Sequence, residues 1–318
     1  MSLNLTSSLA IDYLQYTVYT IQGIQIVVQS FLTFLPILRY PILRLRNGYL
    51  AIATLAMGEI PNGLGFALSG PYRIMVLFMG HRYELKSARE CLLTPHNIFW
   101  VFGEPAAALA LLYFTGDRLI SVLCPVYYFT LSAKIYTVYP LIFMSVALLT
   151  GFGACFVSFM EDQQKLYGSL CFTNWAMGTN YHFKQVYKLV IVISLIGSVL
   201  LYLAVPFIYV KKKSKILPQD QRNDRMQQER YRRMLVTAGI STFHTFLFAL
   251  LPWIVLILLE WRYAGSIPQN IYSAIGPVTG ILNNLNPACN FWLLLVRHTE
   301  FRRALWAFFR RKPSFSMN

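Results

Sequence analysis

The run 190–210, VIVISLIGSVLLYLAVPFIYV, carries no charged side chain, and it decides the fold class. At a rise of about 1.5 Å per residue, roughly 20 such residues form a helix that crosses a hydrocarbon layer about 30 Å thick. The run 234–259 also lacks Lys, Arg, Asp and Glu. Backbone groups in lipid must satisfy their hydrogen bonds within the protein, so both runs predict membrane-spanning helices.

The whole chain has the composition of a membrane protein. Hydrophobic residues make up 56% of its 318 residues and charged residues 13%, and the mean hydropathy is +0.48. We predict an all-α membrane protein with a single domain, 1–318, built as a bundle of seven transmembrane helices. The predicted spans are 13–38, 49–69, 96–116, 136–160, 186–210, 234–259 and 271–296.

The net charge of +15 is distributed unevenly between the two sides of the predicted bundle. Of the 28 Lys and Arg residues, 20 lie in segments that share one side, namely 39–48, 117–135, 211–233 and 297–318. The positive-inside rule therefore predicts an extracellular N-terminus and a cytoplasmic C-terminus, in the plasma membrane. This distribution favours membrane lipid and an acidic cytosolic partner over nucleic acid. Asn4 begins an Asn-Leu-Thr sequon on the predicted outer side and is a candidate for glycosylation.

Two of the five cysteines fall in predicted outer segments. Cys91 precedes the third span and Cys171 follows the fourth. A disulfide persists on the oxidising side of a membrane, so we predict a bond between them, with two free thiols as the alternative. Cys124, Cys155 and Cys289 lie in or beside spans, where cysteine commonly serves as a small buried hydrophobe.

The segment 117–128, DRLISVLCPVYY, lies at the inner end of the third span. It resembles the signature of rhodopsin-like receptors, with Asp117, Arg118, Val122, Pro125 and Tyr128 in register. A charged pair at a membrane edge is by itself also consistent with a snorkelling anchor.

Two more segments are similar to motifs of the same superfamily. LAMGE (55–59) matches a second-helix motif, with Glu59 in place of Asp, and NPACN (286–290) matches a seventh-helix motif, with Asn290 in place of Tyr. Beyond the seventh span, apolar residues at helical spacing predict a short amphipathic helix at 299–310 that lies on the membrane.

With these motifs, the chain resembles nematode serpentine chemoreceptors of the sx class. The resemblance implies a receptor in which an external small molecule or peptide shifts a helix-packing equilibrium and opens a cleft for a heterotrimeric G protein. Arg118 would pair with Asp117 in the closed state. The residues that the resemblance assigns to coupling and activation are Asp117, Arg118, Pro125, Tyr128, Asn286, Pro287 and Asn290.

An acidic residue inside a membrane span suggests a functional site, and Glu59 is one. We predict that Glu59, Asn283 and Asn286 form a polar cluster at mid-membrane. A sodium site there would need a hydroxyl from the third helix, where this chain has Ala107, so a water-filled cluster is the preferred interpretation.

The residues predicted to line a ligand pocket are Phe99, Trp100, Glu104, Trp253 and Tyr272. This would be a mostly apolar pocket with one acidic side chain, although the aromatic residues would equally suit a lipid-facing surface. Trp100 stands where aminergic receptors carry an acidic counter-ion, which argues against a biogenic amine.

Two other classes of function compete with the receptor. A seven-span transporter or channel would require broken helices or charges along a pathway, and no repeat of the kind that builds transporters is visible. A membrane enzyme would require a catalytic or metal constellation, but no histidine has a second histidine or a cysteine three or four residues away. We therefore predict no enzyme, no metal and no cofactor.

Overall fold

The structure, a computed structural model, describes residues 2–44, 47–130, 133–160, 166–172, 181–213, 240, 243–263 and 269–310. Within these residues, five helices are long and apolar enough to cross a membrane, namely α1 (Ser2–Arg39), α3 (Asn47–Phe78), α5 (Pro95–Leu123), α7 (Ala133–Met160) and α9 (Tyr181–Lys213). The predicted all-α class is confirmed.

Two further long helical segments complete the bundle. A π-helical stretch, η2 (Thr245–Leu250), continues directly into the shorter apolar helix α11 (Leu251–Arg262), and α12 (Gln269–Arg297) follows. The short elements are α2 (Pro41–Arg44), η1 (His81–Tyr83), β1 (Leu85–Ser87), α4 (Ala88–Leu92), α6 (Pro125–Thr130), β2 (Leu166–Gly168) and α13 (Thr299–Phe309).

Several helices extend beyond the predicted spans. α1 begins at Ser2, α3 continues past residue 69 to Phe78, and α5 continues past residue 116 to Leu123. The predicted spans leave Arg73 and Asp117 outside the helices, but α3 includes Arg73 and α5 includes Asp117. Arg73 is 0% exposed and Asp117 is 5% exposed, so both charged side chains lie inside the bundle.

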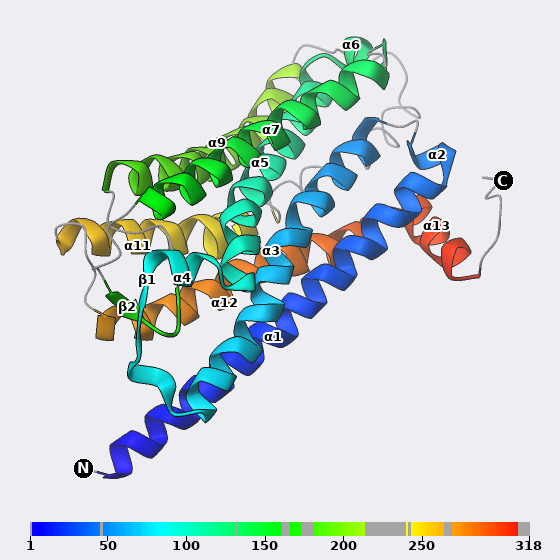
Figure 1. The fold of residues 1–318 in the computed structure, drawn as a ribbon. Coiled ribbons are helices and arrows are strands. Elements are labelled where there is room, and N and C mark those ends of the chain that lie inside the picture. Colours follow the sequence, from blue (N-terminus) through cyan, green and yellow to red (C-terminus); the bar gives the residue numbers. More distant parts are fainter. Residues whose placement is uncertain are drawn as a thin grey trace.

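The long helices pack as one bundle in which α1, α3 and α5 are consecutive neighbours (Figure 1). α1 and α3 approach closely because small residues lie between them. A Cβ on Gly23 would collide with the backbone of Ala67, and one on Gly70 would collide with Tyr16 O. Such small residues are typical of helix interfaces in membranes.

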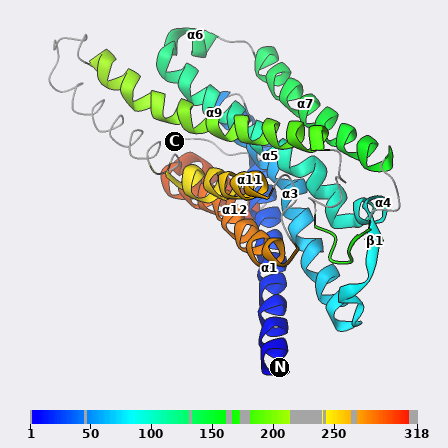
Figure 2. The same cartoon turned by 90° about the vertical axis from the view of Figure 1, so that its left-hand side faces the viewer.

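α7 lies at the periphery, on the side of α5 away from α12 (Figure 2). Many of its apolar side chains point away from the protein, among them Leu141, Leu149, Phe152, Phe156 and Met160. An apolar outer surface of this kind suits a helix that faces lipid.

The inner end of the bundle is defined here as the end that carries α2, α6 and α13 (Figure 1). α13 packs there against α1 and α12. It buries Phe301, Ala304 and Leu305 and exposes Arg302 and Arg303, so it has the amphipathic character expected of a helix at a membrane surface.

The outer end carries a small two-stranded antiparallel sheet of β1 and β2, with Leu85 opposite Gly168 and Ser87 opposite Leu166. A disulfide joins Cys91 in α4 to Cys171 just after β2, with the two Cα atoms 4.9 Å apart. The predicted disulfide is therefore confirmed.

Asn97, in the first turn of α5, forms hydrogen bonds with the backbone of both cysteines of this disulfide. Its side-chain amide donates to the carbonyl oxygens of Cys91 at 2.7 Å and Cys171 at 2.8 Å. His96 lies 3.2 Å from the same Cys171 oxygen through Nε2. The segment 166–172 is thus fixed over the outer ends of α3 and α5.

Candidate functional site

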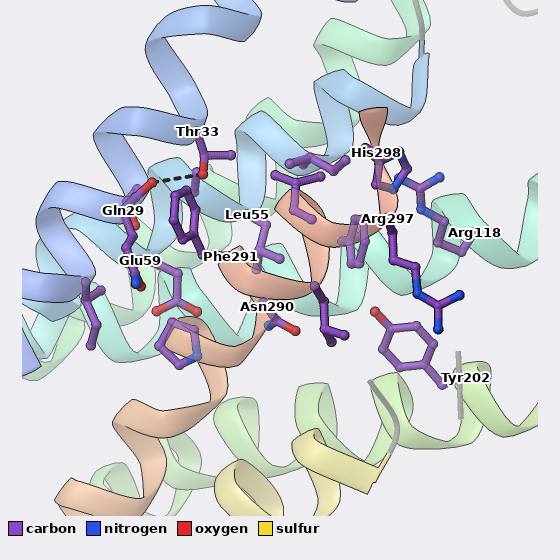
Figure 3. A pocket seen from close by; sticks show the side chains of 18 of the residues that line it. Gln29, Thr33, Leu55, Glu59, Arg118, Tyr202, Asn290, Phe291, Arg297 and His298 are labelled. Carbon is purple, nitrogen blue, oxygen red and sulfur yellow. Dashed lines mark hydrogen bonds between the residues drawn. The ribbon is translucent and has the colours of Figure 1, made fainter. Parts of the chain in front are cut away.

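A cavity of about 390 Å³ lies beside Arg118, Pro287 and Asn290 and extends from the inner end toward mid-membrane (Figure 3). Side chains from α1, α3, α5, α9 and α12 line it. Gln29 and Glu59 lie at its deep end, and Arg118, Arg297 and His298 lie at the other (Figure 3). We call this the inner cavity.

Arg118, on α5, has a side chain that is 30% exposed. Its Nη2 donates to the carbonyl oxygen of Gly48, at the start of α3, at 3.1 Å. Its guanidinium carbon lies 4.9 Å from the centroid of the Phe114 ring. Its ion pair with Asp117 is long, with 3.9 Å between Nε and Oδ2. Arg118 is therefore held by several weak contacts rather than by one close ion pair.

The other residues of the signature explain why Asp117 lies where it does. The chain leaves helical geometry at Cys124, and Pro125 opens α6. This turn brings Tyr128 back toward α5, and its hydroxyl donates to Asp117 at 3.0 Å from Oδ1 and 3.2 Å from Oδ2. The Asp117 side chain is 1% exposed. The structure thus brings Asp117, Arg118 and Tyr128 together through the fixed spacing of the motif.

His298 lies between α12 and α13, outside the spanning segments, beside Arg118. Burial, and secondarily the charge of Arg118, lower the pKa of His298 to about 4. Its ring makes an edge-to-face contact with Tyr49, with 5.8 Å between centroids. The Tyr49 hydroxyl donates to Glu300 Oε2 at 3.4 Å. The mouth of the inner cavity therefore carries guanidinium cations beside a neutral imidazole at pH 7.

A small cavity of about 30 Å³ lies near mid-membrane and is lined by the whole predicted polar cluster, Glu59, Asn283 and Asn286. Thr245, in η2, donates to Asn286 Oδ1 at 3.3 Å. The volume is enough for one or two water molecules with polar partners, and the water-filled cluster stays a prediction. Ala107 lines the cavity where a hydroxyl ligand for sodium would be required.

A third cavity, of about 90 Å³, lies toward the outer end, and we call it the outer cavity. Three predicted pocket residues, Trp100, Glu104 and Trp253, line it. Phe99 is not among the described residues that line it. The Tyr272 side chain lies outside the described residues.

Two residues of the outer cavity were not predicted from the sequence. Arg73 and Lys188 both line it, and both are buried. The description of the pocket as apolar with one acidic side chain was therefore wrong. In the sequence, each of these cations stands next to an apolar run, and this position could have indicated that they are buried. The predicted spans instead placed Lys188 at a membrane edge and Arg73 beyond one.

The three cavities form a series along the bundle. The outer and mid-membrane cavities share Glu104, Trp253 and Asn283, and the mid-membrane and inner cavities share Glu59 and Pro287. Asn290, from the same α12 motif, lines the inner cavity. Some side chains that line one cavity thus also line the next.

The sequence model of the Srsx family of serpentine seven-transmembrane G-protein-coupled chemoreceptors matches residues 70–309. The chain belongs to this family. Comparison with curated proteins gives no match. Membership confirms the predicted sx branch and the seven-transmembrane receptor class, which is not a class of enzymes.

The matched part of this Srsx chain includes both the DRLISVLCPVYY and the NPACN segments. It begins within α3, so α1 and Glu59 precede it. The geometry of Arg118, Tyr128 and Asn290 therefore lies in the matched region, whereas Glu59 is placed by the structure alone.

Proposed function

We propose that this Srsx chain is a chemosensory receptor of the plasma membrane that couples an external small molecule or peptide to a heterotrimeric G protein. Its N-terminus would be extracellular and its C-terminus cytoplasmic, as the distribution of Lys and Arg predicts. Asn4, which lies in α1 near that terminus, stays a candidate for glycosylation, and its side chain lies outside the described residues.

The observation that carries the proposal is the position of Arg118 at the mouth of the 390 Å³ inner cavity. Its contacts, a backbone carbonyl, an aromatic ring and an ion pair of 3.9 Å, are individually weak. A guanidinium so held can turn toward an inserted helix of a partner and donate several hydrogen bonds to it. A basic mouth also favours an acidic partner surface through electrostatic steering.

The outer cavity supports a ligand site at the opposite end of the bundle. It lies beneath the segment that the Cys91–Cys171 disulfide fixes, and Phe172 of this segment is part of its lining. Ligand contacts with Trp253 and Asn283 would reach the mid-membrane cavity, which these residues also line. Tyr272 remains a proposed member of the site. This arrangement supports a two-state receptor in which both ends bias one packing equilibrium.

A transporter or channel of seven spans is the alternative. It would need a pathway through the mid-membrane region, and the described cavity there measures about 30 Å³. Family membership favours the receptor.

The experiment that tests the proposal is a ligand screen in cells that express the receptor together with a promiscuous G protein, with cytosolic calcium as the readout. At least one compound class should raise calcium only in cells with both proteins. A compound that binds the receptor without activating any G protein, while changing ion flux across the membrane, would instead support the channel.

A further inference from the structure

We propose that the outer cavity binds an organic acid through its carboxylate group, with Arg73 and Lys188 as the residues that recognise the anion. The inference rests on the proposed function, in which this cavity is the ligand site, and it adds the chemical class of the ligand. It follows from the charges that the structure places around the cavity.

Arg73 is the largest fully buried side chain in the described part of the protein, with 0% exposure. Its Nε donates to the carbonyl oxygen of Leu170 at 3.1 Å. Its guanidinium carbon lies 4.2 Å from the centroid of the Phe172 ring and 5.2 Å from that of Trp100. Burying a cation costs free energy unless it is compensated, and aromatic faces supply part of the compensation. The fold therefore maintains a positive charge at the wall of the outer cavity.

Lys188 lies on α9, so it reaches the same cavity from another helix. It is 4% exposed, and it interacts electrostatically with Glu104. Arg73, Lys188 and Glu104 are the charged residues of the cavity lining, all of which belongs to the described part of the chain. The lining is net positive whether the Glu104 carboxyl is ionised or not. A ligand group with one negative charge complements it.

The geometry favours a carboxylate over other anions. A guanidinium presents a planar fork that matches the two oxygens of a carboxylate. With Glu104 ionised, the lining carries one net positive charge, so the dianionic form of phosphate would leave a negative charge buried without a counter-ion. A cavity of about 90 Å³ holds a head group rather than a whole ligand. The aromatic rings and Leu256 in the lining suit an apolar remainder attached to that head group.

Thermal melting of the purified, detergent-solubilised receptor tests this proposal without a G protein. The probes are a series of straight-chain monocarboxylates, with hexanoate as the reference, and hexanamide as the matched neutral probe. Hexanoate should raise the melting temperature in a concentration-dependent way, and hexanamide should not. Equal shifts with both probes, a larger shift with inorganic phosphate, or no shift with any acid of the series would overturn the proposal.

Two variants separate recognition of the charge from packing. Lys188→Gln should weaken hexanoate binding about tenfold to a hundredfold, because it removes a charged hydrogen bond to the carboxylate. Glu104→Gln should tighten it, because it removes the like charge from the cavity. Arg73→Gln should abolish binding, but Arg73 also holds Leu170, so the two other variants decide the matter if this one does not fold.

Arg89→Gln is the matched control, because Arg89 is an exposed cation at the same end of the bundle and lies outside the cavity lining. It should leave hexanoate binding unchanged. Equal affinity in Lys188→Gln, Glu104→Gln and the wild type would refute the assignment. Acid binding without any G-protein response in cells would leave the anion site standing and refute the proposed coupling.

Discussion

Tyr128 donates its phenolic hydrogen to the carboxylate of Asp117, at 3.0 Å from Oδ1 and 3.2 Å from Oδ2. The neighbouring Arg118 approaches the same carboxylate only to 3.9 Å. The phenol therefore takes the closer position on a carboxylate that the resemblance assigned to the arginine. Because Tyr128 satisfies the Asp117 carboxylate, Arg118 can leave its ion pair with Asp117 at a small cost in free energy.

Replacing Tyr128 with Phe should destabilise the receptor. The change removes a hydrogen bond to a buried charged group, and such bonds contribute about 1.5–3 kcal/mol. The melting temperature of the purified receptor should fall. Tyr127→Phe is the matched control, because Tyr127 is 59% exposed, and its melting temperature should stay that of the wild type. Equal melting temperatures for the two variants would mean that Asp117 needs no phenol.

The Cys91–Cys171 disulfide should be required for surface delivery. Cys91→Ala and Cys171→Ala should each reduce surface expression, since removing a native disulfide typically costs about 2–5 kcal/mol. The double variant should be no worse than either single variant, because all three lack the same bond. Cys124→Ala, which removes an exposed free thiol, should leave surface expression unchanged. Additive losses in the double variant would contradict the shared-bond explanation.

The sequence predicted the class of fold because lipid imposes one strong rule, that long uncharged runs become helices. It failed at the helix ends, where polar residues do not show whether they lie in a loop or inside the bundle. Arg73 is the clearest case. Its charge argued for a membrane edge, yet α3 continues through it to Phe78. Its burial depends on Leu170 and Phe172, nearly a hundred residues away, and no local pattern contains that information.

The parts of the candidate site that lie close together in the sequence could be predicted, and the parts that meet only through tertiary packing could not. Asp117 and Tyr128 meet because a fixed helix end at Pro125 connects them, so a spacing in the sequence was sufficient. The outer cavity is built from six helices and the segment after β2, so the set of residues that line it depends on tertiary packing. Glu104 was predicted to line the pocket from its position in the third span. Lys188 was not predicted, because only the tertiary fold brings α9 to the same cavity.

The orientation of the chain can be tested with epitope tags. A tag inserted at residue 2 should be labelled on intact cells, and one added after residue 318 should be labelled only after permeabilisation. The physical reason is the concentration of Lys and Arg in segments that share the side of the C-terminus. Labelling of both tags on intact cells would exclude an odd number of spans.

Arg118→Ala should abolish most G-protein activation and leave surface expression near normal. The ion pair is long, at 3.9 Å, and the Tyr128 hydroxyl still bonds the buried Asp117 carboxylate in the variant, so the fold should lose little stability. A neutral side chain, however, cannot donate charged hydrogen bonds to a partner. Nucleotide exchange on the G protein, measured at matched surface expression, is the direct readout.

Arg302→Ala is the control for Arg118→Ala, since Arg302 is an exposed arginine on α13 at the same end of the bundle. It should signal almost normally. Wild-type signalling by Arg118→Ala would show that Asp117 and Arg118 only anchor α5 at the membrane edge. The family assignment would then hold for the fold and fail for this part of the mechanism.

His298 should make stability depend on pH in a window that Arg118 helps to set. Burial and the charges of Arg118 and Arg297 lower its pKa to about 4, against the opposing effect of Glu300. The unfolded chain takes up the proton near pH 6.5, before the folded protein does, so stability is fully present above about 6.5 and is lost progressively toward about 4. His298→Phe keeps an aromatic ring against Tyr49 but cannot titrate, so its melting temperature should fall less than that of the wild type over this range.

Arg118→Ala should raise the pKa of His298, although burial still holds this pKa below the ordinary value. The loss of stability should therefore level off at a higher pH in this variant. Identical pH dependence in wild type and His298→Phe would show that other groups account for it.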